Sequence, residues 1–434
     1  MSYVMMYDEA ATYLHYCDEG IRNLLTFRNL NNHLLHTVLV RIFIEFFGNH
    51  PFVIRIPSLL FGLSNIILVY YISRLFFNKF TSVISILLYS SFPILIHFES
   101  IARGYSPKIT FSLLLFLSCY KYLNMPSKKN MLIVAIVSSL GFLTIFSFIL
   151  PFFGTLLWVV IQTNNNKILK SKIIVGFIIP TIIYTAIFSL FLYIPSIILS
   201  MDFFVYLFNA TTTGAKSYGN FPGDVPVIIK GIFNSFFFNN IFIGIFIVCG
   251  SAYLSIKKNE IAFLVLSHLI TAVALIIIFK ALFPARSFIF LVPFILILTS
   301  KVIDLFFSKF QNHINLTAPL MQLVFYLIIS KNNYLELYHK NSSDLLGVVK
   351  YMNEIPIKFK VYLLDAAGFY MTFKYYHKLN NLPVIEHISY EEIEENQKHM
   401  YLITYNRSSK SFIGFSKVFT NNSFSIYKSM SHFN

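Results

Sequence analysis

Two adjacent carboxylates, Asp8 and Glu9, lie in a polar stretch at the start of a chain that is otherwise mostly apolar. A carboxylate in apolar surroundings has a raised pKa, which suits it to remove a proton from a hydroxyl or an amine. His33 follows, and two arginines, Arg103 and Arg286, come at the ends of later apolar runs. Arginine suits phosphate because its planar guanidinium donates to two oxygens at once. These residue types therefore indicate a proton acceptor and a phosphate-binding group.

Each of these residues also has a plainer interpretation. The acidic pair would favour a helix N-terminus through the macrodipole. Asn32 and His33 would cap the apolar helix that they open. Arg103 would extend its charge from the membrane to the interface, and Tyr105 would belong to an aromatic belt. Glu99 precedes Arg103 by one helical turn, which favours a structural salt bridge between the two.

Composition places the chain among polytopic α-helical membrane proteins. Of its 434 residues, 56% are hydrophobic and 12% are charged, and the mean hydropathy is +0.67. A soluble globular protein carries about 25% charged residues. The net charge of +15 does not indicate nucleic acid, because the lysines and arginines fall in short clusters between apolar runs. The three scattered cysteines fit no metal or disulfide framework.

The apolar runs predict an outer loop and an interfacial helix over 1–50, followed by about nine to ten spans over 51–330. Residues 33–47 are short for a span and carry Arg41 and Glu45 on one face, which favours a helix lying in the interface. The run over 131–161 is too long for one crossing and predicts two short helices with a break near Pro151 and Gly154. The remaining expected spans are 54–77, 81–97, 107–123, 173–193, 236–256, 261–279, 287–307 and 316–330.

The basic clusters predict the orientation of these spans. If Asp8 lies outside, the clusters at 74–79, 128–129, 167–172, 257–258 and 301–309 all fall on one side. That side is cytoplasmic by the positive-inside bias. The acidic pair, Arg103, Arg286 and the tail then lie on the extracytoplasmic side.

The tail over 331–434 is polar and predicts a small extracytoplasmic α/β domain, separate from a membrane domain over 1–330. Strand-like runs at 361–365, 383–388 and 400–405 alternate with helix-like runs at 366–379 and 391–398. This alternation favours a partly parallel sheet.

The order of the motifs resembles a known family. The acidic pair at 8–9 is followed by NNHLLHTVLVRIF over 31–43, HPFVIRIPSLLFG over 50–62 and ARGYS over 102–106. This is similar to the membrane glycosyltransferases of the GT-C superfamily, and most of all to protein O-mannosyltransferases and the lipid A aminoarabinose transferase. The resemblance covers roughly residues 7–300.

The resemblance implies an inverting glycosyltransferase in the inner membrane. Its donor would be a sugar on a polyprenyl phosphate, its acceptor a glycan, lipid or protein, and its active site extracytoplasmic. Asp8 would be the catalytic base, with Glu9 orienting the acceptor or sharing the role. No cofactor is expected beyond the donor lipid. No metal is expected either, because an adjacent Asp-Glu pair differs from the spaced acidic motifs of metal-dependent oligosaccharyltransferases.

The same resemblance assigns the donor phosphate and sugar to Asn32, His33, Arg103, Tyr105 and Arg286. Lys280 is a weaker candidate than Arg286 for binding the donor phosphate. The polar stretch over 201–230 is either a lid that orders on substrate or a linker, and the sequence leaves both open. Family members usually carry a full span before the acidic pair, whereas residues 1–7 are too short to cross, so the anchoring of this loop is also left open.

Two other functions fit the composition. A transporter or flippase of lipid-linked sugars would contain similar spans, but would more often show internal repeats and broken helices in both halves, and the sequence contains no such repeat. The other alternative is a non-catalytic relative that acts as a scaffold.

Overall fold

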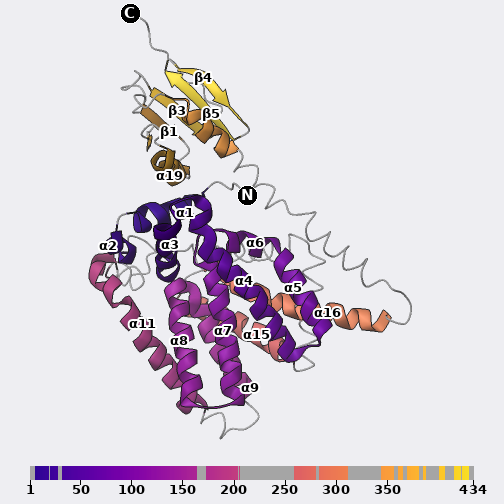
Figure 1. The fold of residues 1–434 in the computed structure, drawn as a ribbon. Helices are drawn as coiled ribbons and strands as arrows, with labels where there is room; N and C mark the ends of the chain where they lie inside the picture. The colour runs from indigo at the N-terminus through magenta and orange to yellow at the C-terminus, as the bar shows by residue number, and fades with distance from the viewer. Residues whose placement is uncertain are drawn as a thin grey trace, which may run out of the picture. The chain divides into compact units, whose positions relative to one another are not determined.

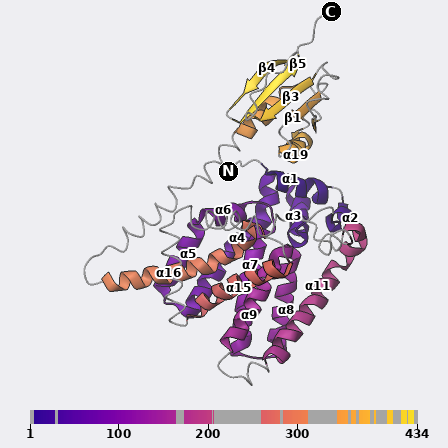
Figure 2. The same cartoon turned by 180° about the vertical axis from the view of Figure 1, so that it is seen from behind.

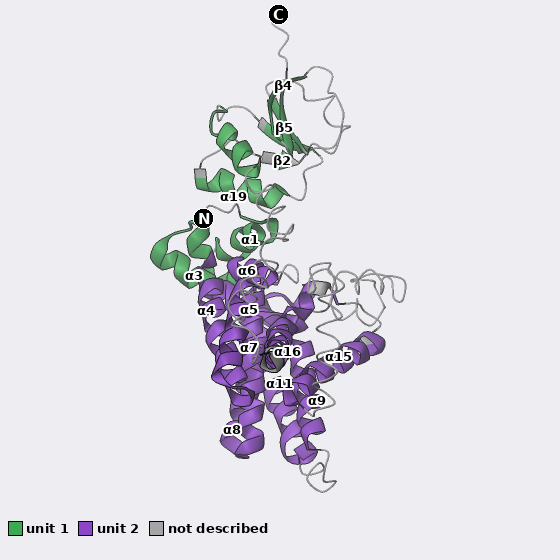
Figure 3. Cartoon of the chain, turned by 90° about the vertical axis from the view of Figure 1, so that its right-hand side faces the viewer, with its two compact units in different colours: residues 1–24, 40–54, 333–434 green, residues 25–39, 55–332 purple. Residues whose placement is uncertain are grey.

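The fold was analysed in a computed structural model, which describes residues 5–18, 20–27, 32–163, 173–203, 205, 259–279, 283–310, 344–355, 360–364, 369–380, 385–387, 400–405, 415–421 and 423–429. By contacts the chain forms two compact units (Figure 3). Unit 1 comprises 1–24, 40–54 and 333–434, and unit 2 comprises 25–39 and 55–332. The expected division into 1–330 and 331–434 stays a prediction, and the contacts group the chain by other boundaries. The expected spans at 236–256 and 316–330, the helix-like run at 391–398, Lys280 and nearly all of the 201–230 stretch lie outside the described residues.

Helices make up the described part of unit 2, as the apolar runs predict. The expected interfacial helix is α3, Leu34–Phe47, and the first expected span is α4, Pro51–Phe76, which carries Pro57 in its first turns. Both helices continue across the boundary between the units. The others are α5 (Lys79–Ser91), α6 (Pro93–Ser100), α7 (Tyr105–Asn124), α8 (Lys128–Thr144), α9 (Ile149–Gln162), α11 (Ile179–Leu199), α15 (Glu260–Phe279) and α16 (Val292–Phe310).

A break interrupts two of the expected apolar runs. The run expected as a single span over 81–97 forms two helices, α5 and α6, which meet at Phe92 with a bend of 60° and make either one broken span or a re-entrant loop. Pro93 begins the second helix at its first position, where the missing N–H costs nothing. The 131–161 run forms two helices as expected. Their break lies earlier than predicted, at a short 3₁₀ turn, η2, Phe146–Phe148, and Pro151 sits inside α9.

Among the described residues, four helices are long and apolar enough to cross a membrane, or five if α5 and α6 together make one span. The four are Pro51–Phe76, Ile174–Leu199, Glu260–Ile278 and Arg286–Leu305. Large apolar side chains on them are exposed to the surroundings, among them Leu63, Phe191, Ile198 and Ile278. Such surfaces are stable in hydrocarbon and costly in water. The chain is therefore a multi-pass membrane protein.

The helices of unit 2 pack as a bundle in which α9 lies against α15 and α8 lies between α7 and α11 (Figures 1 and 2). Small and polar side chains lie at the helix contacts. Ser85 of α5 hydrogen-bonds Ser300 of α16 at 2.6 Å. Ser267 of α15 donates to the carbonyl of Gly154 in α9 at 2.8 Å, and a Cβ on Gly154 would lie 2.2 Å from the ring of His268. Close approach at small residues is the usual way in which helices associate in a membrane.

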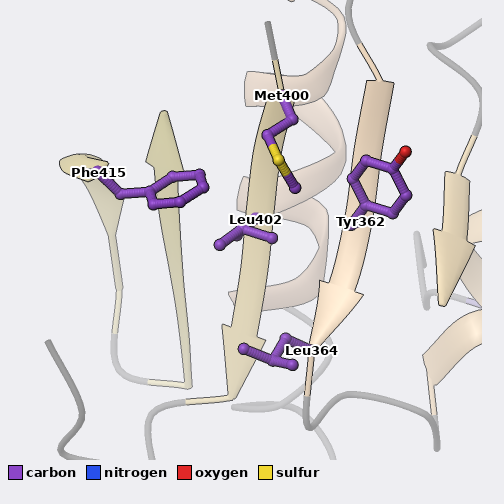
Figure 4. Close-up of a cluster of buried hydrophobic side chains, with 5 residues drawn as sticks. All are labelled: Tyr362, Leu364, Met400, Leu402 and Phe415. Atoms are coloured by element: carbon purple, nitrogen blue, oxygen red, sulfur yellow. The ribbon is translucent and has the colours of Figure 1, made fainter. Parts of the chain in front are cut away.

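Unit 1 contains a five-stranded sheet in the order β2-β1-β3-β5-β4. The strands β1 (Lys360–Leu364), β2 (Ile385–His387) and β3 (Met400–Tyr405) pair in parallel, and the hairpin of β4 (Phe415–Thr420) and β5 (Phe424–Ser429) adds antiparallel to β3. The expectation of a partly parallel sheet is confirmed, and the hairpin is an addition to it. One face carries a buried cluster of Tyr362, Leu364, Met400, Leu402 and Phe415 (Figure 4).

The same unit contains the start of the chain. Helix α1, Tyr7–Thr12, carries the acidic pair and continues into one π-helical turn, η1, Tyr13–Cys17. Helix α19, Tyr370–Asn380, packs against α1 and η1. Phe373 of α19 is fully buried and its ring lies 6.2 Å from that of Phe424 in β5. Helix α19 therefore links the sheet to the segment that carries Asp8.

Candidate active site

The two carboxylates of α1 have different surroundings. Glu9 is fully buried, and its Oε2 accepts a hydrogen bond from the backbone N–H of Met6 at 2.8 Å. That contact closes the N-terminus of the helix, as acidic residues at a third helical position commonly do. Asp8 is half-buried, and its backbone carbonyl accepts from Thr12 Oγ1 at 2.9 Å. Asp8 is therefore the more accessible of the expected pair and the better placed to meet a substrate, whereas Glu9 shapes the helix.

His33 and Arg103 are brought together in unit 2. Both are buried, and Arg103 Nη2 lies 3.2 Å from His33 Nε2. A guanidinium only donates, so Nε2 is the acceptor and the ring is a neutral imidazole with its proton on Nδ1. The sequence predicted that His33 donates to phosphate or sugar oxygens. That role stays a prediction, and in the structure the His33 Nε2 accepts from the guanidinium of Arg103.

Charge and burial agree with a neutral His33. Burial, with a smaller contribution from the charge of Arg286, lowers the pKa of His33 from 6.5 to about 4. Burial lowers the pKa of Arg103 as well, and Arg286 acts in the same direction. An arginine nevertheless keeps its proton in proteins. Because Arg286 affects both groups, the three side chains belong to one electrostatic cluster.

Tyr105 and Gly104 fix the shape of this cluster. Tyr105, the first residue of α7, lies under the guanidinium of Arg103 with 5.5 Å between Cζ and the ring centroid. Its role here is cation–π packing. Gly104 leaves no room for a side chain, because a Cβ would lie 2.4 Å from the carbonyl oxygen of Thr144 and 2.9 Å from His33 Cγ.

Arg286 is the second residue of the 3₁₀ segment η4, Ala285–Leu291, which begins directly after Pro284, and its side chain is exposed. Its neighbour Ser287 is held from α7: Lys108 Nζ donates to the carbonyl of Ser287 at 2.7 Å and to Ser147 Oγ at 2.8 Å. Lys108 is fully buried, and in the described part of the chain it has no carboxylate partner. It therefore anchors the segment that presents Arg286.

Lys108 is a residue that the sequence analysis did not single out. Its signal was available, because a lysine one turn inside an apolar run is rare and usually has a function. Asn32, by contrast, was singled out and makes a local contact. It is buried, and its Nδ2 donates to the carbonyl of Thr26 at 2.8 Å.

The salt bridge expected between Glu99 and Arg103 is wrong. The Oε1 atom of Glu99 accepts from Asn65 Nδ2 at 2.7 Å and from the hydroxyl of Tyr89. These partners come from α4 and α5, and they satisfy the carboxylate inside the bundle. The positive charge of Arg103 is therefore not neutralised by the carboxylate nearest to it in sequence.

Asp8 and Glu9 belong to unit 1, whereas His33, Arg103 and Arg286 belong to unit 2. Their convergence in one pocket stays a prediction. Within unit 2, the guanidinium groups of Arg103 and Arg286 both lie near His33 at the start of α7, where the helix N-terminus adds its own partial positive charge. Such an arrangement binds an anion, and a phosphate matches the fork of Arg103.

Comparison with known proteins identifies the fold. Residues 33–194 match the family model described as "Dolichyl-phosphate-mannose-protein mannosyltransferase". The structure of ArnT from Cupriavidus metallidurans in the apo state superposes with a TM-score of 0.60 at 10% identity, over 98% of this chain and 94% of that one. The chain has the GT-C glycosyltransferase fold. A second ArnT structure, bound to undecaprenyl phosphate, gives a TM-score of 0.58 at 10% identity, over 97% of this chain and 92% of that one.

The resemblance to GT-C glycosyltransferases that the sequence indicated is confirmed as a likeness of fold. The matched family segment begins at His33 and includes Arg103, Tyr105 and Lys108, whereas the acidic pair and Arg286 lie outside it. No curated protein sequence matches the chain. In this GT-C fold, the assignment of individual site residues therefore depends on the contacts described above.

Proposed function

We propose that this GT-C protein transfers a sugar from a polyprenyl phosphate to an acceptor. The observation that carries the proposal is the cluster of Arg103 and Arg286 beside the neutral His33, with Lys108 behind it. A cluster with this charge suits a phosphate that becomes more negative as its sugar leaves. The ArnT structure with bound undecaprenyl phosphate supports the same class of donor.

In the proposed reaction, the acceptor attacks the anomeric carbon on the face opposite the phosphate. A new bond forms between the acceptor oxygen or nitrogen and that carbon, the bond from the carbon to the phosphate oxygen breaks, and the configuration inverts. Asp8 takes the acceptor proton, and the two arginines stabilise the polyprenyl phosphate that departs. The exposed apolar faces of the helices supply the hydrophobic surface on which the prenyl chain packs.

The proposal places this chemistry at the extracytoplasmic face of the inner membrane. The positive-inside bias of the basic clusters supports that orientation. The acceptor would be a glycan, lipid or protein that reaches Asp8 from the aqueous side.

The variant Asp8→Asn tests the function directly. We expect a loss of transfer of about a hundredfold or more, because the amide keeps the shape of the side chain and removes the base. The assay is transfer of labelled sugar in membranes supplied with a panel of polyprenyl-phosphate sugars. Asp202→Asn is the control, because it makes the same chemical change at an exposed residue. Unchanged transfer in a folded Asp8→Asn protein would show that Asp8 is not the base.

A further inference from the structure

The contacts of α19 in the C-terminal α/β domain concentrate on the segment that carries Asp8. The hydroxyl of Tyr376 accepts a hydrogen bond from the backbone N–H of Met5 at 3.2 Å, just before α1 begins. The Nζ atom of Lys378 forms an ion pair with Asp18, just after η1 ends. Helix α19 therefore holds the segment at both of its ends.

The middle of the segment is held through Tyr13. Its ring meets that of Tyr375 edge to face, with centroids 5.2 Å apart and planes at 88°. Both tyrosines are buried, and the hydroxyl of Tyr375 donates to the carbonyl of Asn49 at 2.7 Å. Asn49 Nδ2 in turn donates to the hydroxyl of Tyr13 at 3.1 Å, and that hydroxyl donates to Asp18 at 3.3 Å. One connected network thus joins α19, the α3–α4 turn and η1.

The segments α1 and η1 depend on these contacts for their stability. The two segments together cover only residues 7–17, and a helix of this length is marginal in water without tertiary contacts. The position of Asp8 along its helix is therefore set by the surfaces on which that helix packs. The buried Phe373 of α19 packs near Phe424 of β5 and anchors the helix to the sheet.

We propose that the C-terminal domain is a brace for the catalytic carboxylate, with Lys378 and Tyr375 as positioning residues for Asp8. This inference rests on the proposed function. It assigns the domain a part in the transfer step, and it predicts that damage to α19 slows the reaction while donor binding by the basic cluster of unit 2 is unchanged.

The decisive variant is Lys378→Glu, which places two carboxylates against each other at the end of η1. We expect kcat to fall by about tenfold to a hundredfold, the size of effect that a misplaced catalytic group produces. The KM for the polyprenyl-phosphate donor should stay within about twofold. The double variant Asp18→Lys with Lys378→Glu restores the pair with reversed charges and should recover most of the activity.

Lys374→Glu is the matched control, because it makes the same charge change on the same helix. Lys374 is exposed and packs on Tyr370 of its own helix, with Nζ 5.9 Å from the ring centroid. Equal kcat values for Lys374→Glu and Lys378→Glu would overturn the brace. So would a loss in Lys378→Glu that the reversed pair fails to recover.

Amide hydrogen exchange of residues 7–17 gives a readout that does not depend on transfer. Faster exchange in Lys378→Glu and Tyr375→Ala, but not in Lys374→Glu, supports the brace even if Asp8→Asn shows that another group is the base. Faster exchange without a change in kcat would overturn the positioning role, because the contact would then serve stability alone.

Discussion

The hydrogen bond between His33 and Arg103 gives its two partners different roles. The imidazole accepts from Nη2 of Arg103, so it fixes one arm of the guanidinium and leaves the positive charge on the arginine. The ring of Tyr105 packs against the face of the same guanidinium. We infer that Arg103 is the group that meets the phosphate, and that His33 and Tyr105 determine its orientation.

Replacing Arg103 by lysine tests the need for a planar fork. Lysine keeps the charge but presents a point donor, so the paired contact with a phosphate is lost. We expect the donor KM to rise by about tenfold or more, since one charge-assisted hydrogen bond contributes about 1.5–3 kcal/mol. The exposed Arg74 gives a matched control in Arg74→Lys. A donor KM that is the same in Arg103→Lys and Arg74→Lys would reduce Arg103 to a structural role.

The buried His33 predicts a pH dependence of stability. Its pKa of about 4 lies below the ordinary 6.5, so between these values the unfolded chain binds the proton and the native chain does not. The stability from neutral His33 is complete above about pH 6.5 and is lost as the pH falls to about 4, by about 3 kcal/mol in total. His33→Gln should show a smaller fall in Tm in detergent between pH 7 and pH 4 than the parent.

The exposed His50 supplies the control for that experiment. His50→Gln removes an imidazole that is in contact with water, so its Tm should follow the parent across the whole pH range. If His33→Gln and His50→Gln follow the same curve as the parent, His33 does not contribute to the acid sensitivity.

Residue types predicted which side chains gather in unit 2, but their individual roles depend on partners far away in sequence. His33 and Arg103 were expected near one phosphate and do lie together. The partners of Glu99 are Asn65 and Tyr89, which sit on other helices and carry no pattern that links them to it. Lys108 could have been noticed by type, whereas its contact with Ser287 could not.

At the scale of elements, the site depends on the junction between α6 and α7. After α6 ends at Ser100, the backbone turns with the N–H of Arg103 on the carbonyl of Ile101 at 2.8 Å, and α7 starts at Tyr105. Gly104 lies at this junction against the backbone of Thr144 and the ring of His33. The missing side chain lets α7 begin directly beside the basic cluster.

The variant Gly104→Ala should therefore disturb the site. A Cβ 2.4 Å from the Thr144 oxygen forces the junction and His33 apart, and we expect transfer to fall by about tenfold or more. Gly176→Ala is the control, because a Cβ there meets nothing within 4 Å. Transfer assays on both variants in the same membranes measure the difference. Full activity in Gly104→Ala would mean that the junction tolerates the shift.

The long helices could be read from the apolar runs, because hydrophobic length is a strong signal. The break between α5 and α6 was missed, because the apolar run over 81–97 continues on both sides of Phe92. Only Pro93 marks the start of the new helix. The β4–β5 hairpin was also missed. Most side chains of β4 are exposed, so its sequence carries only a weak strand signal. Its pairing with β5 depends on the neighbouring strands of the sheet.

At the scale of the whole molecule, the orientation in the membrane has a direct test. Ile21 is 73% exposed in unit 1, and Met125 is 67% exposed where α7 ends. If α4, the α5–α6 pair and α7 each cross, the two residues lie on opposite sides. Ile21→Cys should react with a membrane-impermeant maleimide in intact cells, and Met125→Cys only after permeabilisation.

The native cysteines set the background of that labelling: Cys17 and Cys119 are both fully buried, and Cys249 lies outside the described residues. Reaction of both engineered cysteines from the outside would mean that the bent α5–α6 pair returns to the face from which it entered. The count of crossings up to the end of α7 would then be even, and the proposed orientation of the later basic clusters would be wrong.

Unit 1 is assembled from both ends of the sequence: residues 1–24 and 40–54 join residues 333–434. A ribosome delivers the first of these segments long before the last, and β5, which lies between β3 and β4, is made only after all the helices of unit 2. The segment bearing Asp8 must therefore wait for its partners until the sheet has been synthesised. A nascent or prematurely terminated chain would insert its helices while the segment bearing Asp8 still lacked the surfaces on which it packs.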